Sequence, residues 1–302
     1  MRNIIFQTPD APSETLQVFK ANLHTHTTKS DGALEPQDVI DRYAAKDYNV
    51  LALTDHRQVH PIAPYDPKGM ILIQGAELHP LNPERGNNWH LVALDLPEDF
   101  ACVNAAVTGE TAQQVIDLVA AAGGITAVAH PYWCGYGSET VKTVKGAFAV
   151  EIYNTECRGI NREYSLQTWD ELLHDGYRIP GIAVDDVHGA HNLFGGWTVI
   201  CARERTRESV MEALRNGDFY ASQGPEFTSI TLEGDILKAE FTECEYATFI
   251  RTNTGRRVWG EPGKPLTSME LDISDLRGKN WYVRCCIRDA QGRYAWSNPV
   301  YL

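Results

Sequence analysis

The chain is 302 residues long, with 43% hydrophobic and 22% charged residues and a formal net charge of -13. This length allows a substantial buried core and has room for one large domain and a small one. The excess of Asp and Glu argues against a sequence-independent grip on nucleic-acid phosphates, because such a grip needs clustered Lys and Arg. The proportions are otherwise typical of a soluble globular protein.

The 7 cysteines are scattered, and no pair has the Cys-x-x-Cys spacing. An odd number of unclustered cysteines favours reduced thiols in a cytosolic protein over a disulfide framework. The start of the chain lacks the long apolar segment of a signal peptide, and no apolar run is long enough to span a membrane. We therefore expect a cytoplasmic protein, and the sequence makes no prediction of its oligomeric state.

Short apolar runs rich in β-branched residues alternate with helix-like segments from residue 18 to residue 201. Near-continuous hydrophobicity predicts strands buried on both faces, as in parallel sheets. The predicted strands are Val18-Phe19, Val50–Leu53, Ile71–Ile73, Leu91–Leu94, Ile125–Val128, Ala149–Ile152, Ile182–Val184 and Thr198–Ile200. The predicted helices are Gln37–Ala45, Ala112–Ala122, Leu166–Leu173 and a segment that Thr206 caps and Asn216-Gly217 ends. This alternation predicts an α/β domain, either a barrel or a doubly wound sheet.

Beyond residue 224 the pattern changes to alternating apolar and polar residues separated by Gly and Asn turns. The predicted strands here are Ser229–Leu232, Ala247–Arg251, Met269–Ile273, Trp281–Arg284 and Tyr294–Trp296. This texture predicts a small antiparallel, sandwich-like β module, whose alternation directs Tyr282 and Trp296 inward. We therefore assign residues 1–224 to the α/β domain and residues 225–302 to the β module.

The segment from Asn22 to Gly32 reads Asn-Leu-His-Thr-His-Thr-Thr-Lys-Ser-Asp-Gly and follows the first predicted strand. His24 and His26 are two residues apart, so on an extended chain both side chains point to the same side. Both imidazoles can therefore reach one metal ion. Asp31, in the Ser-Asp-Gly turn, can close over a neighbouring ion.

Further His, Asp and Glu residues recur at the ends of predicted strands. In parallel α/β folds the carboxyl ends of the strands lie at one face, where functional sites are built. His90 is an exception, because it precedes its apolar run and so requires an antiparallel strand or a bend. The other residues of this kind are Asp55, His56, Glu77, His130, Asp185, Asp186 and His188. Convergence of several imidazoles and carboxylates predicts a polynuclear metal site.

Each of these residues also has a structural interpretation. A single His-x-His pair is a weak signal, the His130-Pro131 pair suits a simple strand terminus, and Asp55 suits a helix or turn cap. The coincidence favours the metal site, because six of the 10 histidines adjoin buried strands. His60, His79 and His174 lack this placement, and we interpret them as structural, with His79 also a candidate for contact with a metal ligand.

The ordered motifs resemble those of the PHP (polymerase and histidinol phosphatase) superfamily. The resemblance extends from residue 18 to about residue 205 and implies a distorted seven-stranded (β/α) barrel that holds two or three divalent metals at its rim. The motifs that carry it are His24-x-His26, Ser30-Asp31-Gly32, Thr54-Asp55-His56, Gly75-x-Glu77, His90-Leu91-Val92, His130-Pro131 and Asp186-x-His188.

The same resemblance implies a ligand set for each metal. One metal takes His24, His26, Glu77 and Asp186. A second shares Glu77 as a bridge and adds His90 and His130. A third is held by Asp31, His56 and His188, and the family has either His or Asp where Asp31 stands. On ligand type, Mn, Zn and Fe fit, and Mg fits as well.

The resemblance implies a metal-dependent phosphoesterase that hydrolyses a small phosphorylated metabolite with a metal-bridged hydroxide. Bound cations make such a site locally positive, which reconciles an anionic substrate with the acidic chain. Arg158 is the leading candidate for a bidentate contact to the phosphate, ahead of Arg162. His191 can contact phosphate or protonate the leaving group, and Arg57 can reach the rim. For these residues the alternative is an ordinary solvated side chain.

Two other functions use the same motifs. The motifs also resemble those of CehA/McbA-type metallohydrolases, which include carbamate and aryl-ester hydrolases, since an activated water can attack a carbonyl carbon. A non-catalytic, metal-stabilised domain, as in PHP modules attached to DNA polymerases, is the third interpretation. Retention of the full ligand set speaks against the third.

Overall fold

The computed structural model describes residues 3–4, 16–83, 86–102, 109–251, 254–276, 278 and 282–302. The elements of the α/β part are β2 Gln17–Asn22, α1 Pro36–Ala44, β3 Val50–Leu53, β4 Ile71–Leu78, β5 Leu91–Leu94, α3 Ala112–Ala121, β6 Ile125–Val128, α4 Pro131–Cys134, α5 Ser138–Val141, β7 Ala149–Asn154, the 3-10 helix η1 Glu156–Ile160, α6 Leu166–His174, β8 Gly181–Val184, η2 Ala190–Asn192, β9 Trp197–Ala202, α7 Arg207–Asn216 and β10 Phe219–Ser222. Those of the C-terminal part, together with the first strand, are β1 Asn3–Ile4, β11 Phe227–Glu233, β12 Ile236–Cys244, β13 Tyr246–Arg251, β14 Thr254–Trp259, β15 Leu266–Asp272, β16 Tyr282–Arg288, β17 Tyr294–Trp296 and β18 Val300–Tyr301.

The buried strands of the α/β part lie where the apolar runs predicted them. Every residue of β3, β5 and β8 is buried, as expected for strands covered on both faces. The helices are amphipathic and bury one face; α3, for example, buries Val115, Ile116 and Val119. The Thr206 side chain accepts a hydrogen bond from Ser209 N–H, and Gly217 ends α7 with a φ of 78°, which confirms both predicted boundaries of that helix.

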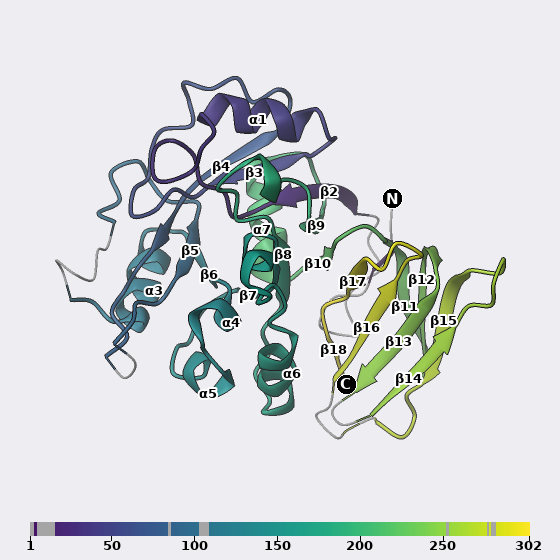
Figure 1. The fold of residues 1–302 in the computed structure, drawn as a ribbon. Coiled ribbons are helices and arrows are strands. Elements are labelled where there is room, and N and C mark those ends of the chain that lie inside the picture. Colours follow the sequence, from purple (N-terminus) through teal and green to yellow (C-terminus); the bar gives the residue numbers. More distant parts are fainter. Residues whose placement is uncertain are drawn as a thin grey trace.

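A single curved sheet runs through the α/β part in the order β9-β2-β3-β4-β5-β6-β7-β8. The pairs β2–β3, β3–β4, β6–β7 and β7–β8 are parallel, whereas β5 is antiparallel to both of its neighbours. In Figure 1 the helices α1, α3 and α6 lie around the outside of this sheet. The start of β5 therefore lies at the same edge as the carboxyl ends of its neighbours, which confirms the antiparallel strand that His90 required.

The segments that follow β2 and β8 hydrogen-bond to each other, which brings the two sides of the curved sheet together. His26 N–H donates to Val187 O at 3.0 Å, and Asp186 N–H donates to His24 O at 3.0 Å. The fold is thus α/β with a largely parallel, curved sheet. It lacks a regular β/α alternation, because the described residues between β3 and β4 and between β8 and β9 contain no α-helix. The seven-fold (β/α) barrel therefore stays a prediction.

The C-terminal strands form two sheets, visible as two layers beside the α/β part in Figure 1. One contains β1, β11, β12 and β15, and the other contains β14, β13, β16 and β17. The second continues into the α/β sheet, because β17 pairs with β10 through Ala221–Trp296 and Ser222–Ala295. Tyr282 and Trp296 are buried, as predicted, while Trp281 lies outside the described residues. The division into domains at residues 224 and 225 remains a prediction.

Asp170 and Arg284 join α6 to β16. The guanidinium of Arg284 is 3% exposed, stacks on Trp169 and donates to both Asp170 oxygens at 2.8 and 2.7 Å. We expect Asp170→Asn to lower the free energy of unfolding by roughly 2–4 kcal/mol, because it removes the partner of a buried charge.

The urea midpoint measures this loss of stability. Asp175→Asn is the matched control, since Asp175 lies at the exposed C-terminal end of the same helix, 2.7 Å from Lys142, and its substitution should lower stability much less. Equal effects of the two substitutions would contradict the importance of the buried pair.

None of the helices that the structure describes has both the length and the apolar character needed to cross a bilayer.

Candidate metal centre

The turn after β2 is held by a buried carboxylate. Asp55 accepts hydrogen bonds from Thr27 N–H at 2.8 Å, Ser30 Oγ at 2.7 Å and His60 Nε2 at 2.8 Å. Burial raises the pKa of Asp55, but the bonds from His60, Ser30 and Thr27 outweigh burial and lower the pKa to about 2. Gly32 fits because a Cβ there would lie 2.6 Å from the His26 carbonyl carbon. The cap interpretation of Asp55 is thereby confirmed.

Four ligand-type atoms converge at the buried end of β2. His24 Nε2 lies 3.0 Å from His26 Nε2, and each of these nitrogens lies 3.1–3.3 Å from Glu77 Oε2 and Asp186 Oδ1. These four residues are all buried. The structure thus brings together the side chains assigned from the sequence to the first metal.

The second oxygen of Glu77 faces a different pair of histidines. His90 Nδ1 lies 2.7 Å from Glu77 Oε1, and His130 Nε2 lies 3.4 Å from the same oxygen. His90 reaches this point from the start of antiparallel β5, opposite the end of β4 that carries Glu77. Glu77 therefore lies between two groups of imidazoles, and its role as a bridge between two metal ions stays a prediction.

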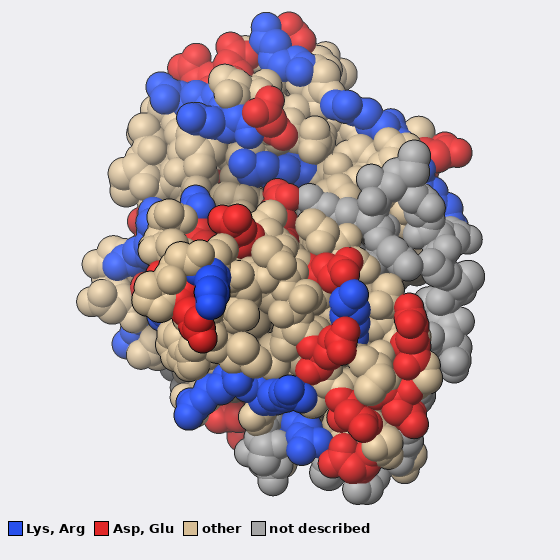
Figure 2. Space-filling view, turned by 90° about the vertical axis from the view of Figure 1, so that its right-hand side faces the viewer, with Lys and Arg blue, Asp and Glu red and all other residues tan. Residues whose placement is uncertain are grey.

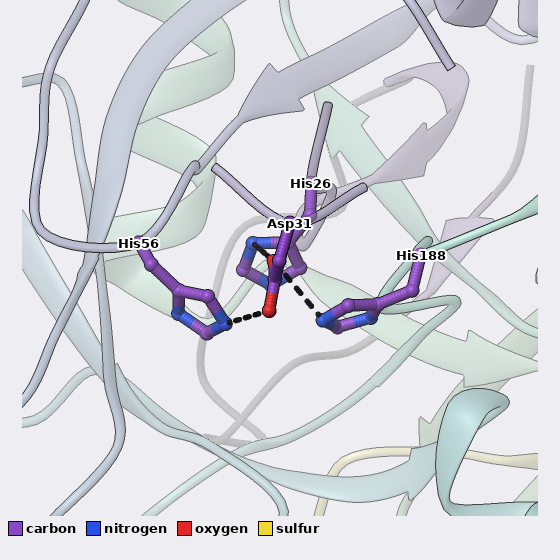
Figure 3. A group of neighbouring side chains, drawn as sticks. All are labelled: His26, Asp31, His56 and His188. Atoms are coloured by element: carbon purple, nitrogen blue, oxygen red, sulfur yellow. Dashed lines mark ion pairs between the residues drawn. The ribbon is translucent and has the colours of Figure 1, made fainter. Parts of the chain in front are cut away.

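A third group lies nearer the solvent and is drawn in Figure 3. Asp31 Oδ2 is 3.3 Å from His56 Nε2, and Asp31 Oδ1 is 3.5 Å from His188 Nε2. His26 Nδ1 lies 4.0 Å from Asp31 Oδ1, so this group adjoins the first. Asp31 is 56% exposed, whereas the carboxylates of Glu77 and Asp186 are buried.

The buried charges shift one another's pKa values in opposite directions. Burial alone would raise the pKa of Glu77, but the neighbouring His90 and His24 hold it well below its usual range. The imidazoles of His24 and His26 likewise hold the pKa of Asp186 low against burial. Burial lowers the pKa of His26, but the adjacent carboxylates of Asp186 and Glu77 raise it to about 9. The carboxylates therefore stay ionised, and the imidazoles attract a positive charge.

The donor set fits divalent metal ions. Tetrahedral ligands about 2.0–2.1 Å from a zinc-sized ion are separated by about 3.3 Å, close to the separations within the first group. Asp186 Oδ1 is buried and has no hydrogen-bond partner among the described residues, although it faces three imidazoles. Imidazole and carboxylate ligands suit Zn, Mn and Fe. Further sets of neighbouring ligand atoms are His24, His130 and Glu151, and His56, Glu77 and His79.

Acid–base groups in the cluster predict how stability depends on pH when metal is removed. Because the pKa of His26 is raised by folding, its protonated imidazole stabilises the fold below pH 6.5, and this contribution is lost as the pH rises to about 9. Because the pKa of Asp55 is lowered by folding, its ionised carboxylate stabilises the fold above pH 3.8, and this contribution is lost as the pH falls to about 2. The chelator-treated protein should therefore be most stable between about pH 4 and 6.5.

Thermal unfolding midpoints from pH 3 to 9.5, with and without metal, measure this dependence. Metal loading should abolish the loss of stability above pH 6.5, because metal binding displaces protons from the imidazoles. A chelator-treated protein that gains stability between pH 6.5 and 9 would contradict the predicted sign.

A cavity of about 210 Å³ opens above these groups. It is lined by Asp31, His56, Glu77, His90, His130, Trp133, Glu156, Cys157, Asp186 and His188. The described lining residues include neither Lys nor Arg. The cavity wall is therefore acidic apart from its imidazoles, and positive charge there depends on protons or metal ions.

The three predicted substrate contacts lie outside the described lining of the cavity. Arg158 is exposed, and its Nε donates to Thr155 O at 3.1 Å. His191 is 76% exposed and 3.7 Å from Glu156 Oε2, and Arg57 is exposed beside the predicted ligand His56. Their roles as substrate contacts remain predictions.

Sequence reasoning missed four residues of the site. Glu151, in the middle of β7, lies 2.7 Å from His24 Nδ1 and accepts His130 N–H at 2.9 Å. Trp133, Glu156 and Cys157 line the cavity from α4 and η1. The signal for Glu151 was a charged residue inside an otherwise apolar run, because a buried charge needs a partner.

The histidines interpreted as structural differ in their surroundings. His60 pairs with Asp55, and His174 lies at the end of α6. His79 Nε2 is 2.9 Å from His56 Nδ1, so His79 contacts a predicted ligand, as its interpretation allowed. Burial lowers the pKa of His79 to about 3, which keeps its imidazole neutral.

No protein-family model matches the chain. Over 97 residues the chain is 34% identical to the 5'-3' exoribonuclease of Haemophilus influenzae. This match covers 31% of the chain and 35% of the exoribonuclease, so the chain matches about a third of that relative's length.

The comparison with solved structures gives one match above a TM-score of 0.5 and others below it. A two-domain protein from Bacteroides vulgatus, containing a predicted PHP-like metal-dependent phosphoesterase, superposes with a TM-score of 0.55 and 14% identity over 100% of this chain and 99% of that chain. The lesion-specific endonuclease PfuEndoQ from Pyrococcus furiosus superposes with a TM-score of 0.45 and 15% identity, over 66% of this chain and 56% of that one. The first similarity spans both parts of the chain, and it shows that the two chains share a fold.

Proposed function

We propose that the chain is a metal-dependent hydrolase that cleaves a small phosphate ester at the cavity above the three ligand groups. The observation that carries this proposal is the position of Glu77, whose two oxygens face separate groups of imidazoles at 2.7–3.4 Å. The PHP-like fold supports the same proposal. Ions bound in adjoining groups would lower the pKa of coordinated water and offset charge on phosphate oxygens.

The chain's own residues position and neutralise these groups. His24, His26, Glu77 and Asp186 would hold one ion, with His90 and His130 completing a second set around Glu77. Asp31, His56 and His188 would hold the third. Without metal, positive charge beside the two buried carboxylates depends on protonated imidazoles, and bound metal ions would supply the positive charge that attracts an anionic substrate.

The cavity size supports a small substrate rather than a long polymer. A volume of about 210 Å³ accommodates a phosphate and a compact organic group. Figure 2 shows acidic and basic side chains interspersed over the face it presents, where the described residues form no continuous basic surface. Together with the net charge of -13, this supports the expectation of no extended grip on nucleic acid.

Arg158 and His191 are exposed outside the cavity, and we retain them as candidate contacts to a bound phosphate. His191 would then act at the leaving-group oxygen as a proton donor, beside Glu156. Arg57 is the third candidate, from the loop after β3.

A second candidate function is hydrolysis of a phosphodiester at the end of an RNA. The identity of 34% over 97 residues to an exoribonuclease favours it. The terminal nucleotide would then lie at the cavity, while the rest of a strand would lie over the surface outside.

A substrate panel tests these proposals. The protein is loaded separately with Mn, Zn, Fe or Mg and assayed with a phosphomonoester, a phosphodiester, an aryl carbamate and a short 5'-phosphorylated RNA. We expect metal-dependent release of phosphate or alcohol from the monoester or diester, and none after chelation. Faster turnover of the carbamate would contradict the phosphoesterase assignment. Stoichiometric metal without turnover of any substrate would favour the non-catalytic interpretation.

A further inference from the structure

Trp133 is an exposed aromatic residue inside a polar cavity. Its side chain is 43% exposed, whereas Trp169 and Trp296 are almost completely buried and Trp89 is 3% exposed. Burying a tryptophan is strongly favourable, so a structural role would be expected to cover it. Trp133 instead lines the cavity beside the predicted ligands.

The indole lies against the second ligand group. Its ring centroid is 5.3 Å from that of His90 and 5.2 Å from that of His130, with interplanar angles of 56° and 77°. A group attached to a phosphate near these imidazoles would therefore lie within contact distance of the indole. The indole thus adjoins the second ligand group and is not at a remote position in the cavity.

The short helix that carries Trp133 is fixed at both ends. Arg162 Nη1 donates to the carbonyl oxygen of Trp133 at 3.2 Å, and Tyr132 N–H donates to Ser165 Oγ at 3.2 Å. Gly135 ends the helix with a φ of 73°. The indole therefore belongs to a preorganised wall, which lowers the entropy cost of binding a ring against it.

The charges around Trp133 disfavour a second anionic group on the substrate. Glu156 lines the same cavity, and the described lining contains no Lys or Arg. The Glu156 carboxylate accepts a hydrogen bond from Asn192 and can accept another from an N–H or O–H of a ligand. An uncharged planar ring, with or without such donors, matches this combination of an aromatic surface and an acceptor.

We propose that Trp133 stacks on a planar aromatic ring in the leaving group of the substrate. The substrate class is thus a phosphate ester whose alcohol part carries an aryl ring or a nucleobase. This inference rests on the proposed function, because it assigns the leaving group of the same reaction. Stacking of a ring on an aromatic side chain changes affinity by about 5- to 150-fold.

Binding and kinetics test the inference with matched ligands. Phenylphosphonate and cyclohexylphosphonate have the same charge and ring size but differ in planarity, and neither is an ester. Calorimetry on the Mn-loaded protein should show about tenfold tighter binding of phenylphosphonate. Adenosine 5'-monophosphate and ribose 5-phosphate share one leaving oxygen, so a higher kcat/KM for the nucleotide identifies a nucleobase as the source of the ring.

Trp133→Leu should remove the preference for phenylphosphonate over cyclohexylphosphonate and the preference for the nucleotide over ribose 5-phosphate. Trp133→Phe should retain most of each preference. Trp259→Leu is the matched control, because Trp259 is 58% exposed on β14 in the C-terminal part and should leave both unchanged. Metal content is measured for every variant, and Trp133→Phe tests the inference if Trp133→Leu loses metal.

Two outcomes separate the inference from the proposed function. A wild-type protein that hydrolyses phosphate esters without a preference for planar rings, or a Trp133→Leu variant that keeps the preference, overturns the role of Trp133 alone. A protein that prefers phenylphosphonate but hydrolyses no ester overturns the phosphoesterase assignment and leaves an aromatic-binding site.

Discussion

Glu77→Gln should abolish hydrolysis and remove most bound metal. The carboxylate is buried, and its oxygens lie 2.7–3.4 Å from His24, His26, His90 and His130. An amide places N–H donors where a lone pair is needed and removes the negative charge that attracts cations. Removing a residue that only hydrogen-bonds to a metal ligand typically lowers metal affinity or activity by about 10–100-fold. Removing a ligand shared by two groups should therefore lower kcat by more than about 100-fold.

Elemental analysis and steady-state kinetics measure the two effects separately. Glu77→Asp keeps the charge but shortens the side chain, so it should retain part of the metal and lose most of the activity. Glu98→Gln is the control, because Glu98 is exposed in the turn after β5. Full metal content with activity within tenfold of the wild type in Glu77→Gln would contradict the shared-carboxylate arrangement.

The strands and the convergence of the ligand-type residues were predictable because burial leaves a simple pattern. Strands covered on both faces read as short apolar runs, and the bounds of Val50–Leu53, Leu91–Leu94 and Ile125–Val128 agree with the structure residue by residue. Parallel strands then carry the residues that follow them to one edge. His90 shows the strength of this logic, because its position before the run predicted either an antiparallel strand or a bend, and β5 is antiparallel.

The cavity wall could not be predicted, because loop side chains depend on long-range contacts. The orientation of Arg158 follows from its bond to Thr155 O, and that of Trp133 from a bond that Arg162 makes from another loop. Neither contact has a sequence signal. The pairing of β10 with β17 is equally hidden, because it joins Ala221 to Trp296 across the whole C-terminal module.

Glu151→Ala should lower metal affinity by about 10–100-fold while leaving every predicted ligand in place. Glu151 Oε1 lies 2.7 Å from His24 Nδ1, so the proton resides on Nδ1 and the Nε2 lone pair faces the site. Glu151 Oε2 accepts His130 N–H at 2.9 Å and so holds a backbone whose φ is 24°, outside the usual regions. One carboxylate thereby orients ligands of two adjoining groups.

Glu151→Gln distinguishes orientation from simple packing. Its amide oxygen can still accept from His24, but its amide nitrogen would face His130 N–H and the Asn154 side-chain amide, both donors to Oε2. We therefore expect Gln to recover part of the affinity lost in Ala, with Glu171→Ala on the exposed face of α6 as the control. Metal titration across pH 6–9 is the measurement, because loss of the fixed tautomer also weakens the rise of affinity with pH. Equal affinity in Glu151→Ala and the wild type would show that His24 and His130 hold their positions without this carboxylate.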